Sequence, residues 1–587
     1  MFSSLSDIQR DIVFNKTGKC VVRACPGSGK TYTLAARLAH KIRNWEKKHQ
    51  GVAVLSFTNI AKDEIINQLY SQWGIKIGYP HFVGTIDSFI NNFIFLPWGH
   101  LLMGCASRPM LVGEPHCQWH HPSGRGIAAY YPGFDAYSFD LSDNLIKTGS
   151  INDRRIPCGN QDITNTTGGH KTNMISAKKE LFQRGYATQQ DSIYFSCKLL
   201  ENYEIIPKLL SQRFPEMLID EAQDTSDKHM AIIDSLIQNG LNEIILVGDP
   251  DQAIYEWNTA DPSLLTNKFR EWEENSTILN ECRRSSQNIC SFVFPLSSLT
   301  TPAVSVSEHK DHSHIPHIVV YNPEDTSNIH ETIKSFLDEC TNHHIPASPA
   351  HIAVLARTWA MHDKIAGTNI PFGARQVIWL REDYYTRHFA LGKYCLDNGL
   401  NVKGFQQLQL GVFKLSKKCQ TFSEDEFSRW LEAQGGETAL RKALLRLLDY
   451  FPMTNQMRLK EWIQHVNNNF ANAEKSVVLR LDPNISSEIK FEDAFREGNN
   501  ASDKEYCLST VHGIKGTTFD ATLLFLSNKG GGALYTNLLA ATSKGNALAE
   551  ELRIIYVAIT RPRKILTIAV PSSEQKSIWE NFFLGVR

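Results

Sequence analysis

The stretch Ala24–Thr31 reads Ala-Cys-Pro-Gly-Ser-Gly-Lys-Thr, a pattern whose residue types suit the binding of a phosphate group. Gly27 and Gly29 allow the backbone to approach a phosphate closely, so that its N–H groups point at the oxygens. The Lys30 ammonium would reach the β- and γ-phosphates, and the Thr31 hydroxyl would hold Mg²⁺. The stretch therefore predicts a P-loop for ATP and Mg²⁺, formed by Ala24, Cys25, Pro26, Gly27, Ser28, Gly29, Lys30 and Thr31.

An acidic pair, Asp220 and Glu221, follows the apolar residues Leu218 and Ile219. Asp220 would hold Mg²⁺, and Glu221 would orient and polarise the water that attacks the γ-phosphate. Such a pair on its own is commonplace at the start of a helix. The P-loop upstream and the Gln-Asp that follows the pair make the assignment more specific.

A third stretch, Leu246–Trp257, adds a group that can sense hydrolysis. The Gln252 amide can hydrogen-bond a γ-phosphate. Tyr255 and Trp257 come directly afterwards, and aromatic side chains there could stack on nucleic-acid bases. Core packing is the commoner role for either aromatic residue alone.

These residues need particular elements to position them. The apolar run Cys20–Val22 precedes the P-loop and a helix-forming segment, Leu34–Ile42, follows it, which is the context that a P-loop requires. Segments that resemble strands and helices alternate over residues 1–90, which predicts a parallel α/β sheet. The alternation stops at about residues 97–171, which are rich in Gly, Pro, His and Asn, and returns before Asp220.

A second α/β pattern begins near residues 317–321, gives way to a mostly helical stretch at 380–475 and returns after residue 505. The simplest organisation is two α/β domains, each interrupted by an inserted domain. With 587 residues the chain is long enough for about three to five domains.

Composition excludes some classes of function. The net charge of -1 gives no global basic signal for nucleic acid, so any such surface must be local. No apolar run is long enough to span a membrane, and the first residues lack a signal-peptide core. The 12 cysteines are scattered without a Cys-x-x-Cys pair, which favours reduced thiols in a cytoplasmic protein.

The order of these motifs resembles that of the superfamily 1 DNA helicases of the UvrD/Rep/PcrA type, over nearly the full length of the chain. Further segments carry the same resemblance: Gln9, Phe57–Asn59, Gly84–Phe89, Leu279–Ser285, Arg357, Thr510–Gly516 and Tyr556–Arg561. The resemblance implies two RecA-like, parallel-sheet P-loop motor domains, each with an inserted subdomain. The boundaries that we expect are 1–95 and 172–283 for the first motor domain, 96–171 for its insert, 284–378 and 500–587 for the second motor domain, and 379–499 for its mostly helical insert.

The resemblance also implies roles for individual residues. Gln9 would read the adenine, Arg284 would take the γ-phosphate arginine role, and Arg561 would be an arginine finger from the second motor domain. Single-stranded DNA would be held by Phe57, Thr58, Asn59, Tyr255, Trp257, Arg357 and His512. Together with Lys30, Glu221 and Gln252, the two arginines form the expected catalytic set.

Several residues depart from the pattern of the family. Asp87 replaces a His, Cys282 replaces an Asn, and Arg283 replaces the Tyr that stacks on adenine. An Arg plane can also stack on a base, so Arg283 is kept as a nucleotide-binding residue. Thr518 replaces a carboxylate that helps to place the ribose, and Asn258 stands where the family often has Arg.

The leading functional hypothesis is an ATP-dependent helicase or translocase on single-stranded or tailed DNA, which moves 3′→5′ if it follows the family. The departures Asp87 and Arg283–Arg284 also resemble helicase subunits of anti-phage systems such as Gabija, so both DNA repair and defence with a partner nuclease are open. The alternative is a DNA-sensing regulatory ATPase that activates a nuclease without processive unwinding. A P-loop ATPase unrelated to nucleic acid is a third possibility, which the ordered motifs disfavour.

Two weaker clusters have ordinary explanations. Cys105, His116, Cys117, His120 and His121 could bind zinc, but their spacing fits no dependable pattern, and histidines in an exposed or DNA-facing loop explain them better. Lys414, Lys417 and Lys418 form a small basic cluster, for which a solvated helix face is the default interpretation.

Overall fold

The structure is a computed structural model. It describes residues 2, 4–112, 126–127, 130, 134, 136–148, 163–165, 168–254, 260–366, 379–380, 385–418, 424–483, 485, 487, 489–495, 505–527, 533–542 and 548–585. The chain divides into two units, which are described separately. The first combines Met1–Phe89, Leu200–Asn369 and Gly498–Arg587, and the second combines Ile90–Leu199 and Ile370–Glu497.

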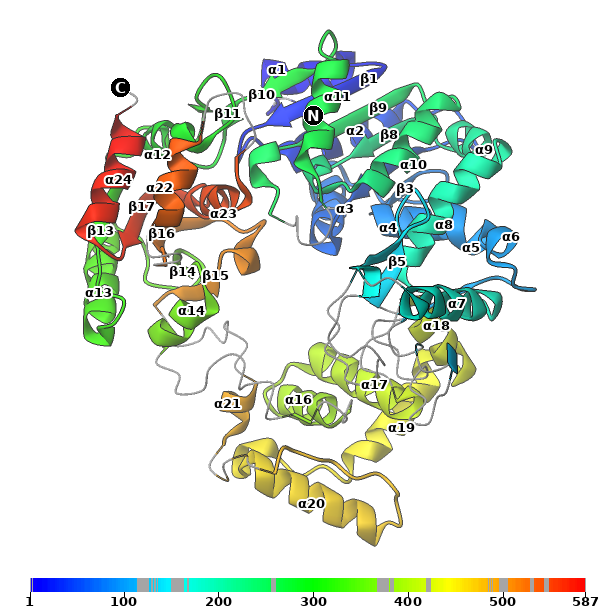
Figure 1. The fold of residues 1–587 in the computed structure, drawn as a ribbon. Coiled ribbons are helices and arrows are strands. Elements are labelled where there is room, and N and C mark those ends of the chain that lie inside the picture. Colours follow the sequence, from blue (N-terminus) through cyan, green and yellow to red (C-terminus); the bar gives the residue numbers. More distant parts are fainter. Residues whose placement is uncertain are drawn as a thin grey trace. The chain divides into compact units, whose positions relative to one another are not determined.

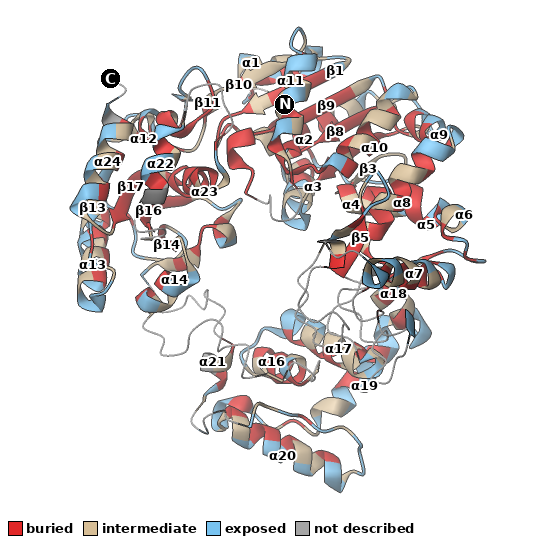
Figure 2. Ribbon diagram, viewed as in Figure 1, coloured by how far each residue is buried: buried red, intermediate tan, exposed pale blue. Residues whose placement is uncertain are grey.

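The first unit contains a six-stranded sheet in which every neighbouring pair is parallel. Its strands, in spatial order, are β10 (Thr277–Leu279), β1 (Lys19–Ala24), β9 (Glu243–Gly248), β8 (Glu216–Ile219), β2 (Val52–Ser56) and β3 (Phe82–Thr85). A parallel sheet is covered on both faces, which explains why its strands are apolar runs without alternation. Figure 2 shows the strands as largely buried.

Helices surround this sheet (Figure 1). They are α1 (Asp7–Arg10), the π-helix η1 (Asp11–Asn15), α2 (Lys30–Arg43), α3 (Asn59–Trp73), α4 (Ile86–Ile90), α9 (Ile205–Arg213), η6 (Ala222–Asp224), α10 (Asp227–Gln238), η7 (Pro250–Gln252) and α11 (Pro262–Glu271). Side-chain caps fix where several of them begin: Thr58 accepts a hydrogen bond from the Ala61 amide at the start of α3, and Ser226 accepts one from His229 at the start of α10.

A second parallel sheet, of five strands, lies in the same unit. Its spatial order is β13 (His317–Val320), β17 (Pro562–Val570), β16 (Phe519–Phe525), β14 (Ile352–Ala356) and β15 (Cys507–Thr510). The associated helices are α12 (Gln287–Val293), η9 (Phe294–Leu296), α13 (Thr326–Asn342), α14 (Trp359–Ala366), η11 (His512–Ile514), α22 (Ala533–Ala540), α23 (Glu550–Ile559) and α24 (Ser573–Leu584). A short ribbon of β11 (Glu281–Cys282) and β12 (Val304–Ser305) precedes the sheet.

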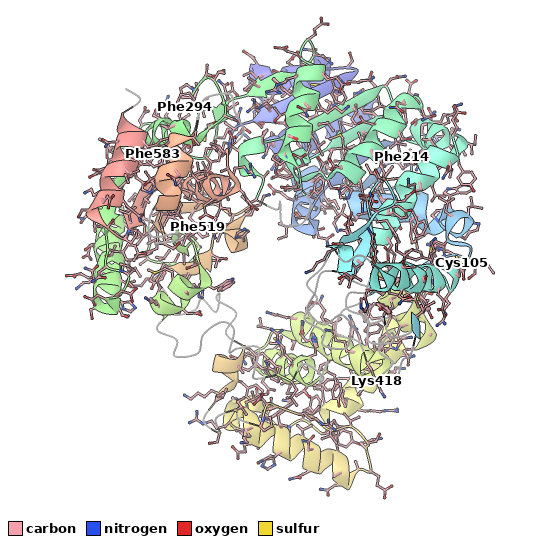
Figure 3. All side chains as sticks on the ribbon, in the orientation of Figure 1. Cys105, Phe214, Phe294, Lys418, Phe519 and Phe583 are labelled. Atoms are coloured by element: carbon pink, nitrogen blue, oxygen red, sulfur yellow. The ribbon has the colours of Figure 1, made fainter. Side chains whose placement is uncertain are left out.

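Aromatic side chains contribute to the core on one face of the second sheet. Phe519 and Phe583, labelled in Figure 3, belong to one buried cluster, and the Phe583 ring stacks on Phe292 with centroids 4.3 Å apart. In the first sheet region Phe214 packs against Phe89. The two parallel sheets confirm the predicted α/β fold class, whereas the domain boundaries given above remain predictions.

The second unit is mostly helical. Its elements are η2 (Asn91–Phe95), α5 (Leu96–Trp98), α6 (His100–Met103), β4 (Met110–Leu111), β5 (Tyr137–Phe139), β6 (Leu145–Lys147), η5 (Ile163–Asn165), α7 (Gly169–Gln183), β7 (Tyr186–Ala187), α8 (Gln189–Asn202), α16 (Thr386–Asp397), α17 (Asn401–Lys417), α18 (Glu424–Ala433), α19 (Gly436–Leu448), η10 (Thr454–Gln456), α20 (Leu459–Asn472) and α21 (Phe491–Ala494). The short strands β5 and β6 pair antiparallel.

Two features of the second unit bear on the weaker sequence clusters. Cys105 is buried and donates its thiol hydrogen to the Ser107 carbonyl, while His116, Cys117, His120 and His121 lie outside the described residues. Lys418, labelled in Figure 3, follows the last residue of α17 in a left-handed conformation. Among the described residues, no helix combines the length and the apolar character that crossing a lipid bilayer requires.

Candidate active site

The P-loop lies between a central strand and a helix of the first sheet. β1 ends at Ala24, and α2 begins at Lys30 with Gly29 as its N-cap in the left-handed region. Gly27 also has a positive φ, and a Cβ atom there would lie 2.6 Å from Cβ of Arg284. Glycine is therefore required at position 27 both by the backbone conformation and by the close approach of Arg284.

The two residues expected to hold Mg²⁺ lie next to each other. The Thr31 hydroxyl donates a hydrogen bond to Asp220 Oδ2 at 3.0 Å, and the Asp220 amide donates to the Leu55 carbonyl at 2.8 Å. Hydroxyl and carboxylate oxygens are the donors that Mg²⁺ prefers. Ser28 Oγ, in the same loop, is buried without a hydrogen-bond partner among the described residues, as expected if a polar ligand completes the loop. The donor set therefore fits a Mg²⁺-bound nucleotide.

Glu221 adopts an unusual backbone conformation beside the P-loop. Its φ is 53°, in the left-handed region that a non-glycine residue seldom occupies, and such conformations concentrate at functional sites. Its carboxylate lies 3.4 Å from Lys30 Nζ and accepts a hydrogen bond from Gln223 at 2.5 Å. Burial by itself would raise the pKa of Glu221, but the charges of Lys30 and Lys515 hold that pKa below its ordinary value. Glu221 is therefore ionised at neutral pH.

The net pKa shift of Asp220 has the opposite sign. Desolvation and the neighbouring Glu221 charge raise the pKa of Asp220 to about 7. Burial also lowers the pKa of Lys30, yet the three nearby carboxylates of Glu221, Asp249 and Asp220 raise it overall. The Lys30 ammonium therefore stays charged, as phosphate binding requires.

The expected γ-phosphate sensors come together from both sheets. Gln252 donates its amide hydrogen to Asp249 at 2.6 Å and accepts one from Arg561 at 2.8 Å. Arg284 donates to the carbonyl of Thr560, the residue before Arg561, at 3.0 Å. Neither arginine has an ion-pair partner among the described residues, and burial together with the adjacent Arg284 lowers the pKa of Arg561. Two neighbouring guanidinium groups without an ion pair among the described residues are suited to an anionic ligand.

Gln9 and Arg283, expected at the adenine, lie in contact with each other. Gln9 is fully buried, its amide hydrogens go to Ser28 O and to Thr33 Oγ1, and its oxygen accepts from Arg283 at 2.9 Å. The Arg283 backbone amide also donates to the Gly27 carbonyl at 2.8 Å. Cys282 lies close by, because a Cβ on Gly27 would come within 3.3 Å of its sulfur.

Sequence reasoning missed a second row of contacts between the sheets. Lys515 Nζ pairs with Asp224 at 2.8 Å, and Arg553 on α23 donates to the Ala253 carbonyl at 2.7 Å. Within the first sheet region, Gln223 connects Glu221 to the Asp249 amide, which lies 3.0 Å from its oxygen. Lys515 and Gln223 lie inside motifs that the sequence analysis recognised, and those positions could have indicated a functional role. Arg553 lies in an apolar helix whose sequence gives no such indication.

The residues expected to touch DNA already have partners in the protein. Thr58 caps α3, and Phe57 packs edge-on against His229 with ring centroids 5.6 Å apart. Arg357 forms a two-pronged ion pair with Glu551. Asn59 is exposed, and burial lowers the pKa of His512, with Arg357 and Lys515 adding to the effect.

The expected site residues fall into two groups. The nucleotide set comprises Lys30, Thr31, Asp220, Glu221, Gln252, Arg284 and Arg561. The DNA set comprises Phe57, Thr58, Asn59, Arg357 and His512, and its other two expected members, Tyr255 and Trp257, lie outside the described residues. Asp87, which replaces a family His, lies 3.3 Å from His229 Nε2 beside Phe57.

A P-loop on one parallel sheet, met by Arg284 after β11 and by Arg561 directly before β17 of a second parallel sheet, defines an ATPase with two RecA-like domains. Family models match this chain as the UvrD/REP helicase N-terminal domain at residues 5–95 and 158–272, and as the UvrD-like helicase C-terminal domain at residues 415–573. The chain belongs to the UvrD/Rep family of ATP-dependent DNA helicases. The predicted resemblance is thereby confirmed.

Individual relatives give the same classification at different coverage. YjcD of Bacillus subtilis (strain 168), whose name describes an ATP-dependent DNA helicase, is 23% identical over 97% of this chain and 79% of its own length. The Gabija protein GajB of Bacillus cereus (strain VD045) is 25% identical over 48% of this chain and 46% of its own length. The exonuclease/helicase protein RexA of Streptococcus pneumoniae serotype 4 is 26% identical over 27% of this chain and 14% of its own length.

Proposed function

We propose that the chain hydrolyses ATP in order to move 3′→5′ along single-stranded DNA, and that it opens duplexes that carry a single-stranded tail. Family membership supports the ATPase and the DNA substrate, and the 3′→5′ direction rests on the resemblance alone. Within the first unit, the nucleotide set supplies the groups that the hydrolysis needs, and three contacts between the sheets supply a route from hydrolysis to movement.

The hydrolytic roles follow from the contacts of each side chain. The P-loop amides and Lys30 bind the phosphates, and Thr31 with Asp220 would hold Mg²⁺, which offsets charge on the phosphate oxygens when it is bound. Ionised Glu221 accepts hydrogen bonds from Lys30 and Gln223, so its carboxylate is fixed to orient the attacking water. Arg284 and Arg561 stabilise the charge that develops on the transferred phosphoryl group.

The coupling follows from the contacts that join the two sheets. Arg561 reaches Gln252, Lys515 reaches Asp224, and Arg553 reaches Ala253, all on the first sheet side. A γ-phosphate between the arginines and the P-loop favours this closed arrangement, and its loss after hydrolysis weakens it. DNA held by members of the DNA set on both sheets would then be gripped and released in turn.

The contact between Arg561 and Gln252 is the observation that carries the proposal, and it sets the test. ATP turnover is measured with and without single-stranded DNA for the unmodified protein, Arg561→Ala and Arg561→Lys. We expect both variants to bind nucleotide but to lose about 10³-fold in kcat, the typical contribution of an arginine finger. Arg563→Ala, whose side chain pairs with Asp520, is the matched control and should keep its turnover. Undiminished DNA-stimulated turnover in Arg561→Ala would contradict the proposal.

A second candidate function is regulatory. We propose it because similarity extends to GajB and to the exonuclease/helicase protein RexA, so the chain would work with a partner nuclease in defence against phage, with repair as the other setting. In this version ATP turnover reports DNA to the nuclease without processive unwinding. Strand separation on duplexes with a 3′ tail or a 5′ tail decides between the versions: unwinding from the 3′ tail favours the helicase, and strong DNA-stimulated turnover without unwinding favours the regulator.

A further inference from the structure

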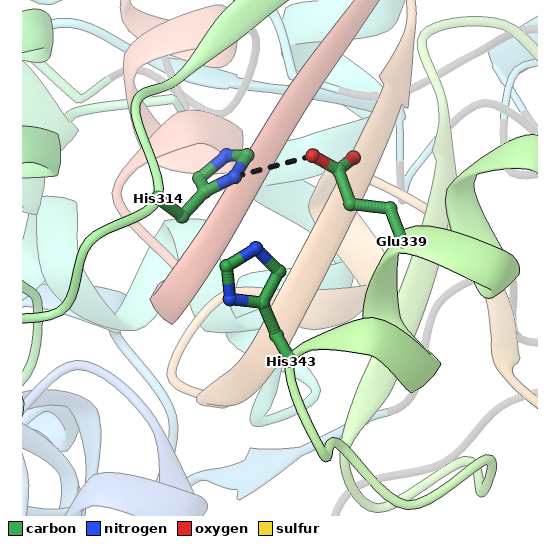
Figure 4. Close-up of side chains that lie close together, drawn as sticks. All are labelled: His314, Glu339 and His343. Atoms are coloured by element: carbon green, nitrogen blue, oxygen red, sulfur yellow. Dashed lines mark ion pairs between the residues drawn. The ribbon is translucent and has the colours of Figure 1, made fainter.

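Two histidines and a glutamate that belong to neither the nucleotide set nor the DNA set gather beside the second sheet. His314 lies in the segment that leads into β13, Glu339 lies in the last turn of α13, and His343 caps the end of that helix. One nitrogen or oxygen from each of these three side chains lies within 4.8 Å of the others. Figure 4 shows the three side chains pointing toward one another from the helix and the neighbouring segment.

The spacing of the three groups suits a small divalent cation. Ligand atoms around a tetrahedral Zn²⁺ ion lie about 3.4 Å apart, because each is about 2.1 Å from the ion. His314 Nδ1 lies 3.2 Å from Glu339 Oε1, so this pair is already at that separation. Glu339 and His343 are four residues apart on the helix, which places both on one face. Small side-chain rotations would therefore complete the geometry.

The surroundings fix two of the three ligands. The His314 side chain is 3% exposed, and its Nε2 lies 3.2 Å from the Leu566 carbonyl oxygen on β17 and 3.3 Å from the Leu566 amide nitrogen. In the tautomer whose Nε2 carries the ring proton, Nε2 donates to this carbonyl and the lone pair of Nδ1 faces Glu339, as a metal ligand requires. In the other tautomer, Nε2 accepts from the Leu566 amide and Nδ1 donates to Glu339, which is the metal-free ion pair. Thr567 supports the carboxylate, with its hydroxyl 3.5 Å from the other oxygen of Glu339. Contacts of this kind orient and hold metal ligands in proteins.

We propose that His314, Glu339 and His343 bind one Zn²⁺ ion, which ties the end of α13 to the segment before β13. Two imidazoles and one carboxylate suit Zn²⁺ better than Mg²⁺ or Ca²⁺, which prefer oxygen ligands alone. The site is a structural clamp on the second sheet and is separate from the Mg²⁺ site of the nucleotide set. Its competitor is a proton shared between His314 and Glu339 without any metal.

The test counts zinc in the full chain. Protein stripped with a chelator and then dialysed is titrated with Zn²⁺ against a chromophoric competitor, for the unmodified chain, His343→Ala and Glu339→Gln. We expect each variant to bind one Zn²⁺ fewer than the unmodified chain, and Zn²⁺ to raise the melting temperature of the unmodified chain by more than that of the variants. His344→Asn is the matched control, because His344 has a positive φ that Asn tolerates and lies next to the site.

A spectroscopic measurement excludes zinc bound at other positions. Co²⁺ substituted at this site has only nitrogen and oxygen ligands, so it should give the visible bands of tetrahedral cobalt without thiolate charge-transfer bands, and His343→Ala should abolish the visible bands. Equal Zn²⁺ stoichiometry in the unmodified chain and both variants would overturn the proposal. It would also be overturned if the only Co²⁺ signal had thiolate bands and was lost in Cys117→Ser, which would move the metal to the cysteines and histidines near residues 105–121.

Discussion

The nucleotide set and the DNA set lie in one unit of the protein, but they differ in whether their side chains already have partners within it. In the nucleotide set and its P-loop, polar groups from both sheets converge on one place, and some lack a partner among the described residues: Ser28 Oγ has no hydrogen bond, and Arg284 and Arg561 have no ion pair. In the DNA set, Thr58 caps a helix and Arg357 is bound to Glu551. A bound nucleotide would supply the missing hydrogen-bond and ion-pair partners, whereas bound DNA would have to replace contacts that already exist within the protein.

This difference predicts that the nucleotide set tolerates substitution least. Replacing Lys30 with Ala removes the ammonium that faces Glu221 and the phosphates, and we expect kcat for ATP to fall by about 10²–10³-fold, as for the loss of one preorganised electrostatic group. ATP turnover is measured with saturating DNA, and circular dichroism checks the fold. Lys576→Ala, on the surface of α24, is the control. Near-normal turnover in Lys30→Ala would remove the P-loop assignment.

Substitutions in the DNA set should lower the affinity for DNA and leave the ATP hydrolysis that occurs without DNA unchanged. Trp257→Ala should weaken binding to single-stranded DNA by about 1–3 kcal/mol if a base stacks on the indole, with turnover in the absence of DNA unchanged. Fluorescence anisotropy with a labelled oligonucleotide measures the affinity, and Trp98→Ala, an exposed indole in the second unit, is the control. Unchanged DNA affinity and unchanged stimulation of turnover would assign Trp257 to the core instead.

The pH dependence of Mg²⁺–ADP binding tests the assignment of Asp220 as a Mg²⁺ ligand. Because burial raises the pKa of Asp220 to about 7, this carboxyl must lose its proton before it can hold Mg²⁺. Binding of Mg²⁺–ADP should therefore release about half a proton at pH 7, more at pH 6 and almost none at pH 8.5, and affinity should fall as pH drops below 7, by up to about tenfold per unit.

Calorimetric titration in buffers with different ionisation enthalpies counts those protons. Asp220→Asn has no proton to lose at this position, so it should bind more weakly and release about half a proton fewer at pH 7 than the unmodified protein. If proton release were the same in Asp220→Asn as in the unmodified protein, the raised pKa would belong to another group.

Substitutions of Thr58, which have the smallest expected effect, distinguish a structural role of this residue from a contact with DNA. Thr58→Ala should lower the free energy of unfolding by about 1 kcal/mol, because the amide of Ala61 loses its acceptor. Thr58→Asp keeps an N-cap and should restore that stability, but its charge should weaken DNA binding if Thr58 lies against the phosphate backbone. Equal DNA affinity for Thr58→Asp and the unmodified chain would remove Thr58 from the DNA set.

The fold class and the convergence of the nucleotide set could be predicted because they depend on local signals. Apolar runs that end in Gly-Lys-Thr or in Asp-Glu place their polar residues at the ends of parallel strands, and such ends meet at one edge of a sheet. Thr31 and Asp220 duly lie 3.0 Å apart, although they are far apart in the chain. Binding of the nucleotide by these residues remains a prediction.

The rest depends on contacts that no local pattern encodes. The pairing of Lys515 with Asp224 joins two sheets whose register against each other is set by tertiary packing. The partner of Arg357 is Glu551, which lies in a helix without any recognised motif at that position. His314, Glu339 and His343 likewise come together only because the end of one helix packs against the segment before a strand. The spacing of these residues in the sequence does not predict that contact.

The strand order of the second sheet has a consequence for synthesis of the chain on the ribosome. β13 and β14 are made early, but among the described strands β13 pairs with β17, and β14 pairs with β15 and β16. Both strands therefore leave the ribosome before these neighbours, which follow at residues 507–570. Exposed apolar strands invite aggregation, so nascent β13 and β14 are at risk until β15, β16 and β17 have been made, whereas all six strands of the first sheet have been made by residue 279.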